Sequence, residues 1–193
     1  MSKDIFLGYI KKHIDLNENE ESIILSKIKE RKYLKNQFLV QQGDVCRYVV
    51  FIFTGCVRSY HVDDDGNEHT VSFSIENWWS SDMGSFITQK PADYNVQCIE
   101  PTSLIQFDSV LMEELFKTVP KLERFFRIIS QNALVSAQRR VVNTFSKTAR
   151  ERFEIFREDY PELEQRIPQY MIASYLGVTK EFLSKIKGQI ARE

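Results

Sequence analysis

The sequence predicts an α+β fold, in which an N-terminal antiparallel β-roll, a jelly-roll-like barrel with flanking helices, precedes a long helix and an all-α C-terminal domain. Three observations predict it. Short apolar runs recur between residues 38 and 107, at the roughly ten-residue spacing of small antiparallel barrels. After residue 108 the apolar period changes from two to about 3.6. A content of 42% hydrophobic and 27% charged residues excludes disordered and fibrous proteins.

The first half contains the strand-like segments. Residues 1–30 are predicted to be helical, because Ile23, Ile24 and Ile28 recur at helical spacing among charged residues. The predicted strands are residues 38–40, 48–53, 56–62, 71–75, 96–99 and 104–107. Turn residues separate them at Gly43-Asp44, at Thr54-Gly55 and in the run 63–67. This alternation predicts the β-roll.

The second half begins with a short helix, capped at Asp108 or Ser109 and ending near Pro120. A long helix follows, with a coiled-coil-like stripe formed by Leu122, Phe126, Ile129 and Ala133. We predict that this stripe pairs two copies of the chain. The alternative, that it packs only on the β-domain of its own chain, stays open because two heptads are a short signal.

Charge is unevenly distributed along the chain. Residues 1–108 carry 11 Lys and Arg against 16 Asp and Glu, whereas residues 109–193 carry 15 against 11. This asymmetry suggests an acidic half and a basic contact half. Charged residues interrupt the apolar runs, so no membrane span or signal peptide is predicted and a cytoplasmic protein is expected. The three cysteines are widely separated and are interpreted as buried thiols.

Residues 169–186, QYMIASYLGVTKEFLSKI, carry the most specific motif. Gly177 lies where a helix must end in a left-handed turn, and Ala173 is small enough for a second helix to cross closely. The apolar residues expected to hold the two helices together are Ile172, Leu176, Val178, Leu183 and Ile186. This combination predicts a helix-turn-helix.

The second helix of this motif would carry a polar outer face. Thr179 is its predicted N-cap. The side chains predicted to contact double-stranded DNA are Thr179, Lys180, Glu181, Ser184, Lys185 and Lys187. Lysine can donate to guanine or phosphate, and glutamate can accept from a cytosine amino group. The alternative is a helical hairpin with a solvated charged face.

Several segments together resemble the Crp/Fnr family of bacterial regulators over nearly the whole chain. The segments are Gln42-Gly43-Asp44, Thr54 to Arg58, Asp82 to Phe86, Arg166 to Gln169 and the helix-turn-helix. The resemblance implies a cyclic-nucleotide-binding-like sensor over residues 1–118, a dimerisation helix and linker over 119–145, and a DNA-binding domain over 146–193. It also implies a homodimer on a near-palindromic operator and contact with RNA polymerase.

The sequence departs from the family pattern at its C-terminus. Family members usually have a strand hairpin after the helix-turn-helix, and because this chain ends at Glu193 a truncated wing is expected. A second function therefore stays open, namely a ligand-binding or interaction module whose degenerate helix-turn-helix no longer reads DNA. No phosphate loop, nucleophile elbow or catalytic pairing is present, so no enzyme and no cofactor are predicted.

The resemblance also locates a degenerate effector pocket. Its residues are Ser81, Asp82, Met83, Ala92, Asp93, Ala137 and Gln138. Asp82 stands where cyclic-nucleotide members have a glutamate, Ala92 stands at the phosphate-binding arginine and Asp93 follows it. An anion beside Asp93 without an arginine would be repelled, so tight cyclic AMP binding is not expected. Lys90 is the one nearby cation that could replace the arginine.

The sensor half contains two further sets of candidate ligand-binding residues, one aromatic and one of histidines. The aromatic residues around the pocket would suit an unknown apolar effector, or they could simply fill a vacated site. These residues are Trp78, Trp79, Met83, Phe86 and Tyr94. His13, His61 and His69 suggest a cupin-like metal site, but a third ligand at fixed spacing is missing, so no metal is predicted.

Overall fold

The computed structural model describes residues 2–192. It begins with two helices, α1 (Ser2–Lys11) and α2 (Glu18–Lys27), where one helical stretch was expected. The break follows from a capping box: the Asn17 side chain accepts a hydrogen bond from the Glu20 amide, and the Glu20 carboxylate accepts one from the Asn17 amide. These reciprocal bonds favour starting a new helix at this point.

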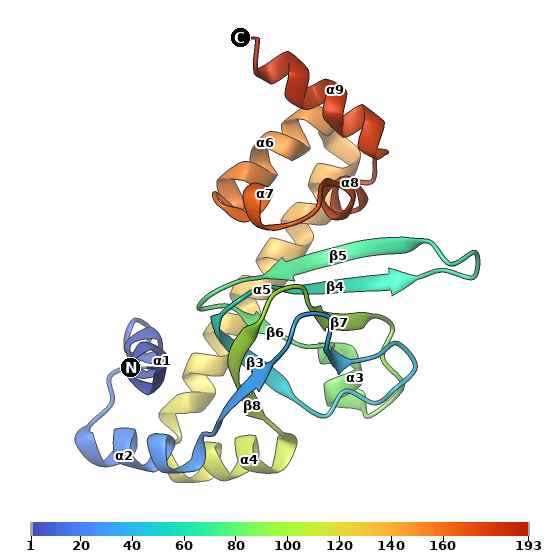
Figure 1. Cartoon of the computed structure of the whole chain (residues 1–193). Helices are drawn as coiled ribbons and strands as arrows, with labels where there is room; N and C mark the ends of the chain where they lie inside the picture. Colours follow the sequence, from blue (N-terminus) through green and yellow to red (C-terminus); the bar gives the residue numbers. More distant parts are fainter. Residues whose placement is uncertain (1, 193) are drawn as a thin grey trace.

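In the described part of the chain, eight strands form two antiparallel four-stranded sheets. The strands are β1 (Glu30–Tyr33), β2 (Phe38–Val40), β3 (Val49–Thr54), β4 (Val57–Val62), β5 (Glu68–Ser74), β6 (Trp79–Ser80), β7 (Asn95–Cys98) and β8 (Thr102–Phe107). Their orders are β1-β8-β3-β6 and β2-β7-β4-β5. Figure 1 shows β4, β5 and β7 of the second sheet side by side. The predicted α+β roll is confirmed, as two facing sheets rather than a closed barrel.

β1 and β6 are not among the strands predicted from the sequence. β1 consists of Glu-Arg-Lys-Tyr and is mostly exposed, so it has no apolar alternation, and it forms because it pairs with β8 in register. β6 is only two residues long and pairs with the middle of β3. Both strands depend on long-range pairing rather than on a local pattern.

Gly55 closes the β3–β4 turn with a φ of +101°. A Cβ atom at this position would lie 2.6 Å from Thr102 Oγ1 and 2.7 Å from the Pro101 carbonyl oxygen. Both the backbone conformation and the close approach therefore require glycine. This turn fixes how the chain passes from β3 of the first sheet to β4 of the second.

One helix, α3 (Met83–Thr88), lies between β6 and β7 of the roll, and two helices, α4 (Ser109–Thr118) and α5 (Lys121–Ser146), follow β8. Asp108 caps α4 as predicted, accepting a hydrogen bond from the Leu111 amide at 2.7 Å. The first three turns of α5 pack on α1, α2 and the sheet. Among the described residues, none of the helices combines the length and hydrophobicity that crossing a bilayer requires.

The predicted dimerisation stripe on α5 needs correction. Leu122 is 2% exposed, and Phe126 and Ile129 pack against the same sensor core. Phe126 alone makes ring contacts with Trp79, Phe107, Phe116 and Phe125. These side chains are thus used within the protomer, which is the alternative weighed from the sequence, and of the four residues only Ala133 is exposed.

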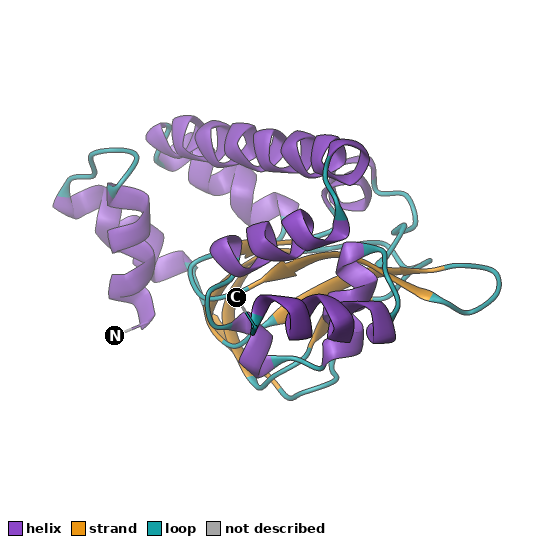
Figure 2. Ribbon diagram, turned by 90° about the horizontal axis from the view of Figure 1, so that it is seen from above, coloured by secondary structure: helices purple, strands orange, loops and turns teal. Residues whose placement is uncertain are grey.

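Four helices make the C-terminal head: α6 (Ala149–Asp159), α7 (Leu163–Arg166), α8 (Gln169–Leu176) and α9 (Lys180–Ile190). Viewed from above, they lie over the strands of the roll (Figure 2). Their core is shared with the sheet, because Cys56, Phe73 and Ile99 belong to the same buried cluster as the helix residues. The head is thus packed on the roll rather than tethered to it.

Candidate nucleic-acid interface and sensor pocket

The turn between α8 and α9 has the geometry predicted from the sequence. Gly177 ends α8 with φ +66° and ψ +37°, and its amide donates back to the last turn of that helix. Ala173 is 3% exposed where the helices cross, and Leu183 and Ile186 of α9 are buried against α8 and α6. These contacts hold α9 at a fixed angle as the second helix of a helix-turn-helix.

The outer face of α9 is polar and free of contacts. Thr179 caps the helix, its hydroxyl accepting a hydrogen bond from the Phe182 amide at 3.2 Å. Four side chains are exposed and make no hydrogen bond or ion pair with another described residue: Lys180, Glu181, Ser184 and Lys185. α9 lies at the end of the head farthest from the roll (Figure 1). This face is open to a large partner.

Lys187, also predicted to contact DNA, is placed differently. Its ammonium lies 2.7 Å from Oε1 of Glu164 on α7, and its side chain is 29% exposed. Lys187 follows Ile186 on the helix and therefore borders the buried face. The structure thus gives Lys187 an ion pair within the head instead of a place on the free polar face.

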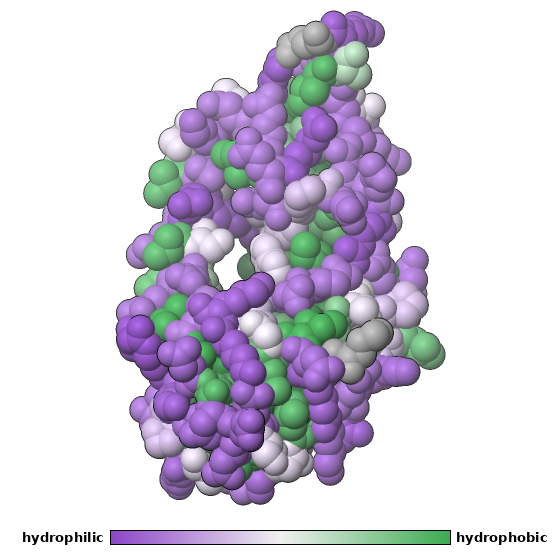
Figure 3. All heavy atoms as spheres, turned by 90° about the vertical axis from the view of Figure 1, so that its left-hand side faces the viewer, coloured by the Kyte–Doolittle hydropathy of each residue, from purple (hydrophilic) through white to green (hydrophobic). Residues whose placement is uncertain are grey.

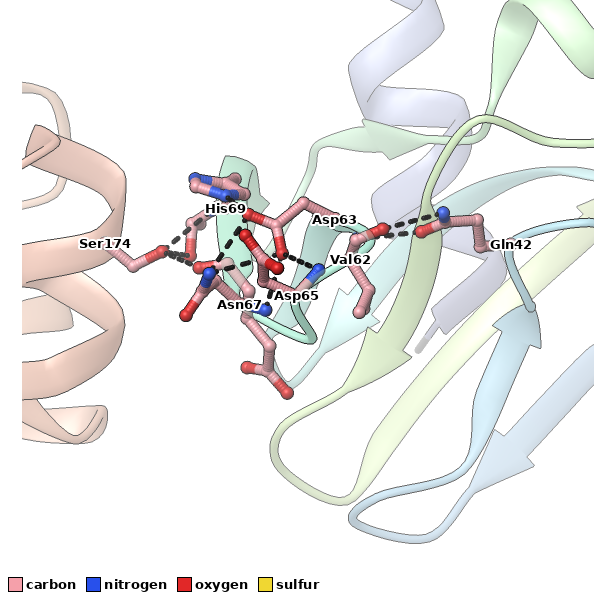
Figure 4. Close-up of polar contacts among 9 residues, drawn as sticks. Gln42, Val62, Asp63, Asp65, Asn67, His69 and Ser174 are labelled. Carbon is pink, nitrogen blue, oxygen red and sulfur yellow. Dashed lines mark hydrogen bonds and ion pairs between the residues drawn. The ribbon is translucent and has the colours of Figure 1, made fainter.

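Side chains of α8 and α5 satisfy the free edge of β5, which is the last strand of its sheet. The Ser174 hydroxyl accepts from the Thr70 amide at 2.9 Å and donates to the Glu68 carbonyl at 2.6 Å (Figure 4). Arg140 of α5 donates to the Thr70 carbonyl and stacks on Tyr175, 4.1 Å from its ring centroid. An unpaired strand edge is thereby satisfied without another strand.

The tip of the β4–β5 hairpin is organised by one carboxylate. Asp63 accepts hydrogen bonds from the backbone amides of Asp65 and Asn67 and contacts Nε2 of His69 at 2.7 Å (Figure 4). The bond with His69 is the main reason that the pKa of Asp63 is lowered to about 2. The carboxylate is thus charged near neutral pH and stabilises the hairpin whose strand β5 is hydrogen-bonded to Ser174.

A second contact between head and roll is ionic. Arg166, at the end of α7, donates to Glu76 at 2.9 and 3.0 Å and to Glu100 at 2.7 and 3.1 Å. We call these three residues the clamp. Burial raises the pKa of Glu76, but the hydrogen bonds from Arg166 and from backbone amides bring it below its ordinary value. The clamp binds the start of the helix-turn-helix to two loops of the roll.

The docking role of Arg166 and Ser174 was not predicted from the sequence. The partners of Arg166 lie 66 and 90 residues away, and those of Ser174 lie 104 and 106 residues away. No local pattern marks a pair at such separations. A polar residue such as Ser174, in a helix otherwise rich in apolar residues, was the one available signal.

The predicted effector pocket is occupied by the protein itself. Asp82 is 2% exposed and caps α3, its Oδ1 accepting from the Ser85 amide and its Oδ2 from the Asp93 amide, both at 2.9 Å. Ala92 is 4% exposed and supplies no positive charge. The amides that could meet a ligand anion here therefore already bind the Asp82 carboxylate.

The remaining pocket residues divide into two groups. Ser81 lies beside Asp82, and its carbonyl accepts from the Tyr94 hydroxyl at 3.1 Å, while Phe86 and Tyr94 pack in the apolar cluster inside the roll. Burial raises the pKa of Tyr94. By contrast, Met83, Ala137 and Gln138 are exposed, the last two on the part of α5 beyond the roll. The structure thus gathers Ser81, Asp82, Ala92 and Asp93 but not all seven.

The histidines weighed for a metal site have other partners. His61 and His69 face each other across β4 and β5. However, Nδ1 of His61 lies 2.7 Å from the Asp93 carbonyl oxygen, and Nε2 of His69 contacts Asp63. Within residues 2–192 no group of three or more His, Cys, Asp and Glu side chains could hold a metal ion.

Comparisons with known proteins agree with this architecture. Residues 30–119 match the family model described as the cyclic nucleotide-binding domain. The chain is 23% identical over 203 residues to electron transport regulator A of Shewanella oneidensis, covering 98% of this chain and 80% of that protein. It is 24% identical over 191 residues to the fumarate and nitrate reduction regulatory protein of Vibrio cholerae, covering 92% and 75%.

A solved structure extends the likeness beyond the sensor. The structure of FixK2 from Bradyrhizobium japonicum superposes with a TM-score of 0.72 at 21% identity, over 86% of this chain and 85% of that one. The matched fraction is too large to be the roll alone, so the likeness extends into the C-terminal half of the chain.

Proposed function

Because the chain belongs to the Crp/Fnr family of transcriptional regulators, we propose that it acts as a homodimer that binds a near-palindromic operator through α9. We further propose that its sensor does not bind cyclic AMP tightly. The observation that carries the proposal is the free polar face of α9, whose Lys180, Glu181 and Lys185 are exposed and make no hydrogen bond or ion pair within residues 2–192. Such side chains match the donors and acceptors on base edges and phosphates.

A second copy of the chain is the proposed partner of α5. Beyond the roll this helix exposes five large apolar side chains by 54–85% each: Leu134, Val135, Val141, Val142 and Phe145. They lie on the side of the helix opposite to Leu122, Phe125 and Ile129, as the 100° step per residue requires. The same helix of a second protomer would cover this stripe and place two recognition helices on one DNA duplex.

The proposal that cyclic AMP is not an effector rests on Asp82. A bound phosphate would have to replace the Asp82 carboxylate at two backbone amides, and the protein would have to bury two anions together. Neither Ala92 nor the exposed Asp93 offers compensation. Unpaired buried charge of this kind is strongly unfavourable.

The test is a selection of genomic DNA fragments on the purified protein at two salt concentrations, with and without cyclic AMP. We expect a near-palindromic site that is unaffected by the nucleotide. A cyclic AMP-dependent site would contradict the sensor proposal. Binding without any sequence preference would favour the alternative, an interaction module with a degenerate helix-turn-helix.

Charge removal then tests the interface itself. The double variant Lys180→Ala/Lys185→Ala should lose operator affinity. The negative slope of the logarithm of the binding constant against the logarithm of the salt concentration should become shallower by about 0.9 for each phosphate contact removed. The matched control, Lys35→Ala/Lys117→Ala, removes the same charge from exposed positions in the sensor half. Equal effects of the two variants would mean that binding follows net charge and not α9.

A further inference from the structure

Phe182 is an exposed aromatic residue in the first turn of the recognition helix. Its side chain is 48% exposed, whereas Leu183 and Ile186 of the same helix are 0% and 3% exposed. Among the described residues it belongs to none of the buried clusters and stacks on no other ring. The folded protomer therefore gains little from a phenylalanine at this position.

The backbone at Phe182 is nevertheless firmly placed. Its amide donates to the Thr179 hydroxyl that caps α9, so the residue stands at the third position of the helix. At 100° per residue its side chain lies between the outer face of Glu181 and the buried face of Leu183. On the face seen in Figure 3, hydrophilic side chains dominate the head and few apolar groups interrupt them. Phe182 is thus a fixed apolar group at the border of a polar contact face.

The major groove offers one apolar group for such a side chain. Base edges there present hydrogen-bond donors and acceptors, and in addition the C5-methyl group of thymine, which packs against apolar side chains such as phenylalanine. The N-terminal residues of a recognition helix are those that reach base edges. Given the proposed function, on which this inference rests, we propose that Phe182 is a specificity-determining residue that recognises a thymine methyl group in each half-site.

Uracil substitution tests this contact, because it removes the methyl group and keeps both base pairing and hydrogen-bonding edges. Each thymine of the selected operator is replaced in turn by uracil. At one position per half-site, the wild-type affinity should fall by about fourfold, the factor for one buried methyl group, and by about 15-fold when both half-sites are changed. Phe182→Ala should bind the thymine and uracil operators equally at that position.

Two further variants control for indirect effects. Phe182→Leu keeps an apolar contact and should retain part of the preference for thymine. Phe38→Ala removes a phenylalanine that is 36% exposed on β2 of the sensor and should keep the full preference. Since Phe182 is outside the core, Phe182→Ala should unfold at the same denaturant concentration as the wild type.

The outcomes separate this proposal from the proposed function. A selected operator whose binding is insensitive to uracil everywhere refutes the Phe182 contact alone. A uracil effect of equal size in Phe182→Ala also refutes it, because the effect would then come from DNA shape. If Phe182→Ala is a monomer where the wild type is a dimer, the residue belongs to a protein interface and the proposal is overturned. If selection yields no operator at all, the proposed function fails and the Phe182 contact fails with it.

Discussion

Replacing Arg166 with methionine should weaken the docking of the head on the roll. The substitution keeps the aliphatic stem but removes all four hydrogen bonds of the clamp. It also leaves Glu76 and Glu100 close together without a cation. Removing one partner of a fully buried ion pair lowers the free energy of unfolding by about 3–5 kcal/mol. The clamp side chains are 24–35% exposed, so we expect a loss of about 2–3 kcal/mol after solvent screening.

Urea denaturation measures this loss, and Arg157→Met is the matched control. Arg157 pairs with Glu164 at 3.5 Å within the head and is 52% exposed, so its loss should change the free energy of unfolding by less than about 1 kcal/mol. Backbone hydrogen exchange locates the effect. The Thr70 amide, which donates to Ser174 across the docking surface, should exchange faster in Arg166→Met but not in Arg157→Met.

Equal stability of Arg166→Met and Arg157→Met, or unchanged exchange at Thr70, would contradict this role of the clamp. The first result would mean that desolvation cancels the gain from the clamp's ion pairs. The second would mean that the apolar cluster shared by the head and the sheet holds the docking without the clamp.

Asp82, Phe145 and Asp63 provide tests of three other parts of the molecule. Asp82→Ala leaves two backbone amides without their acceptor and should lower the free energy of unfolding by about 2–4 kcal/mol. The exposed control Asp64→Ala should change it by less than about 0.5 kcal/mol, and equal losses in the two variants would contradict the structural role of Asp82. Phe145→Ser should leave protomer stability unchanged but weaken self-association more than about tenfold, as measured by sedimentation equilibrium. The control Val110→Ser, which alters a side chain 76% exposed on α4, should leave self-association unchanged. The pKa of Asp63, about 2, lies below its ordinary value of 3.8, so its contribution to hairpin stability is complete above that ordinary value and is lost as the pH falls toward 2. Protection factors of the hairpin amides, measured by NMR hydrogen exchange and corrected for the intrinsic pH dependence of exchange, should fall in that window, and Asp63→Asn should abolish this fall.

The sequence alone determined the elements whose signals are local. The helix-turn-helix was predicted because Ala173, Gly177 and Leu183 occupy fixed positions within eleven residues, and each is required by backbone geometry or close helix crossing. The Asp108 cap and most strands of the roll were likewise predicted from neighbouring residues. Short-range sterics and hydrogen bonding restrict such segments before the chain folds.

The tertiary structure decided which surfaces are used and which remain free. The apolar residues of α5 predicted a buried face, but two such faces exist, and only folding shows that Phe126 packs on the protomer whereas Phe145 is exposed. In the same way, the sequence identified Asp82 as a pocket residue, but the two amides that it binds come together only in the folded loop. Periodicity records that a side chain is apolar or charged, while its partner depends on contacts between distant segments, which no local pattern encodes.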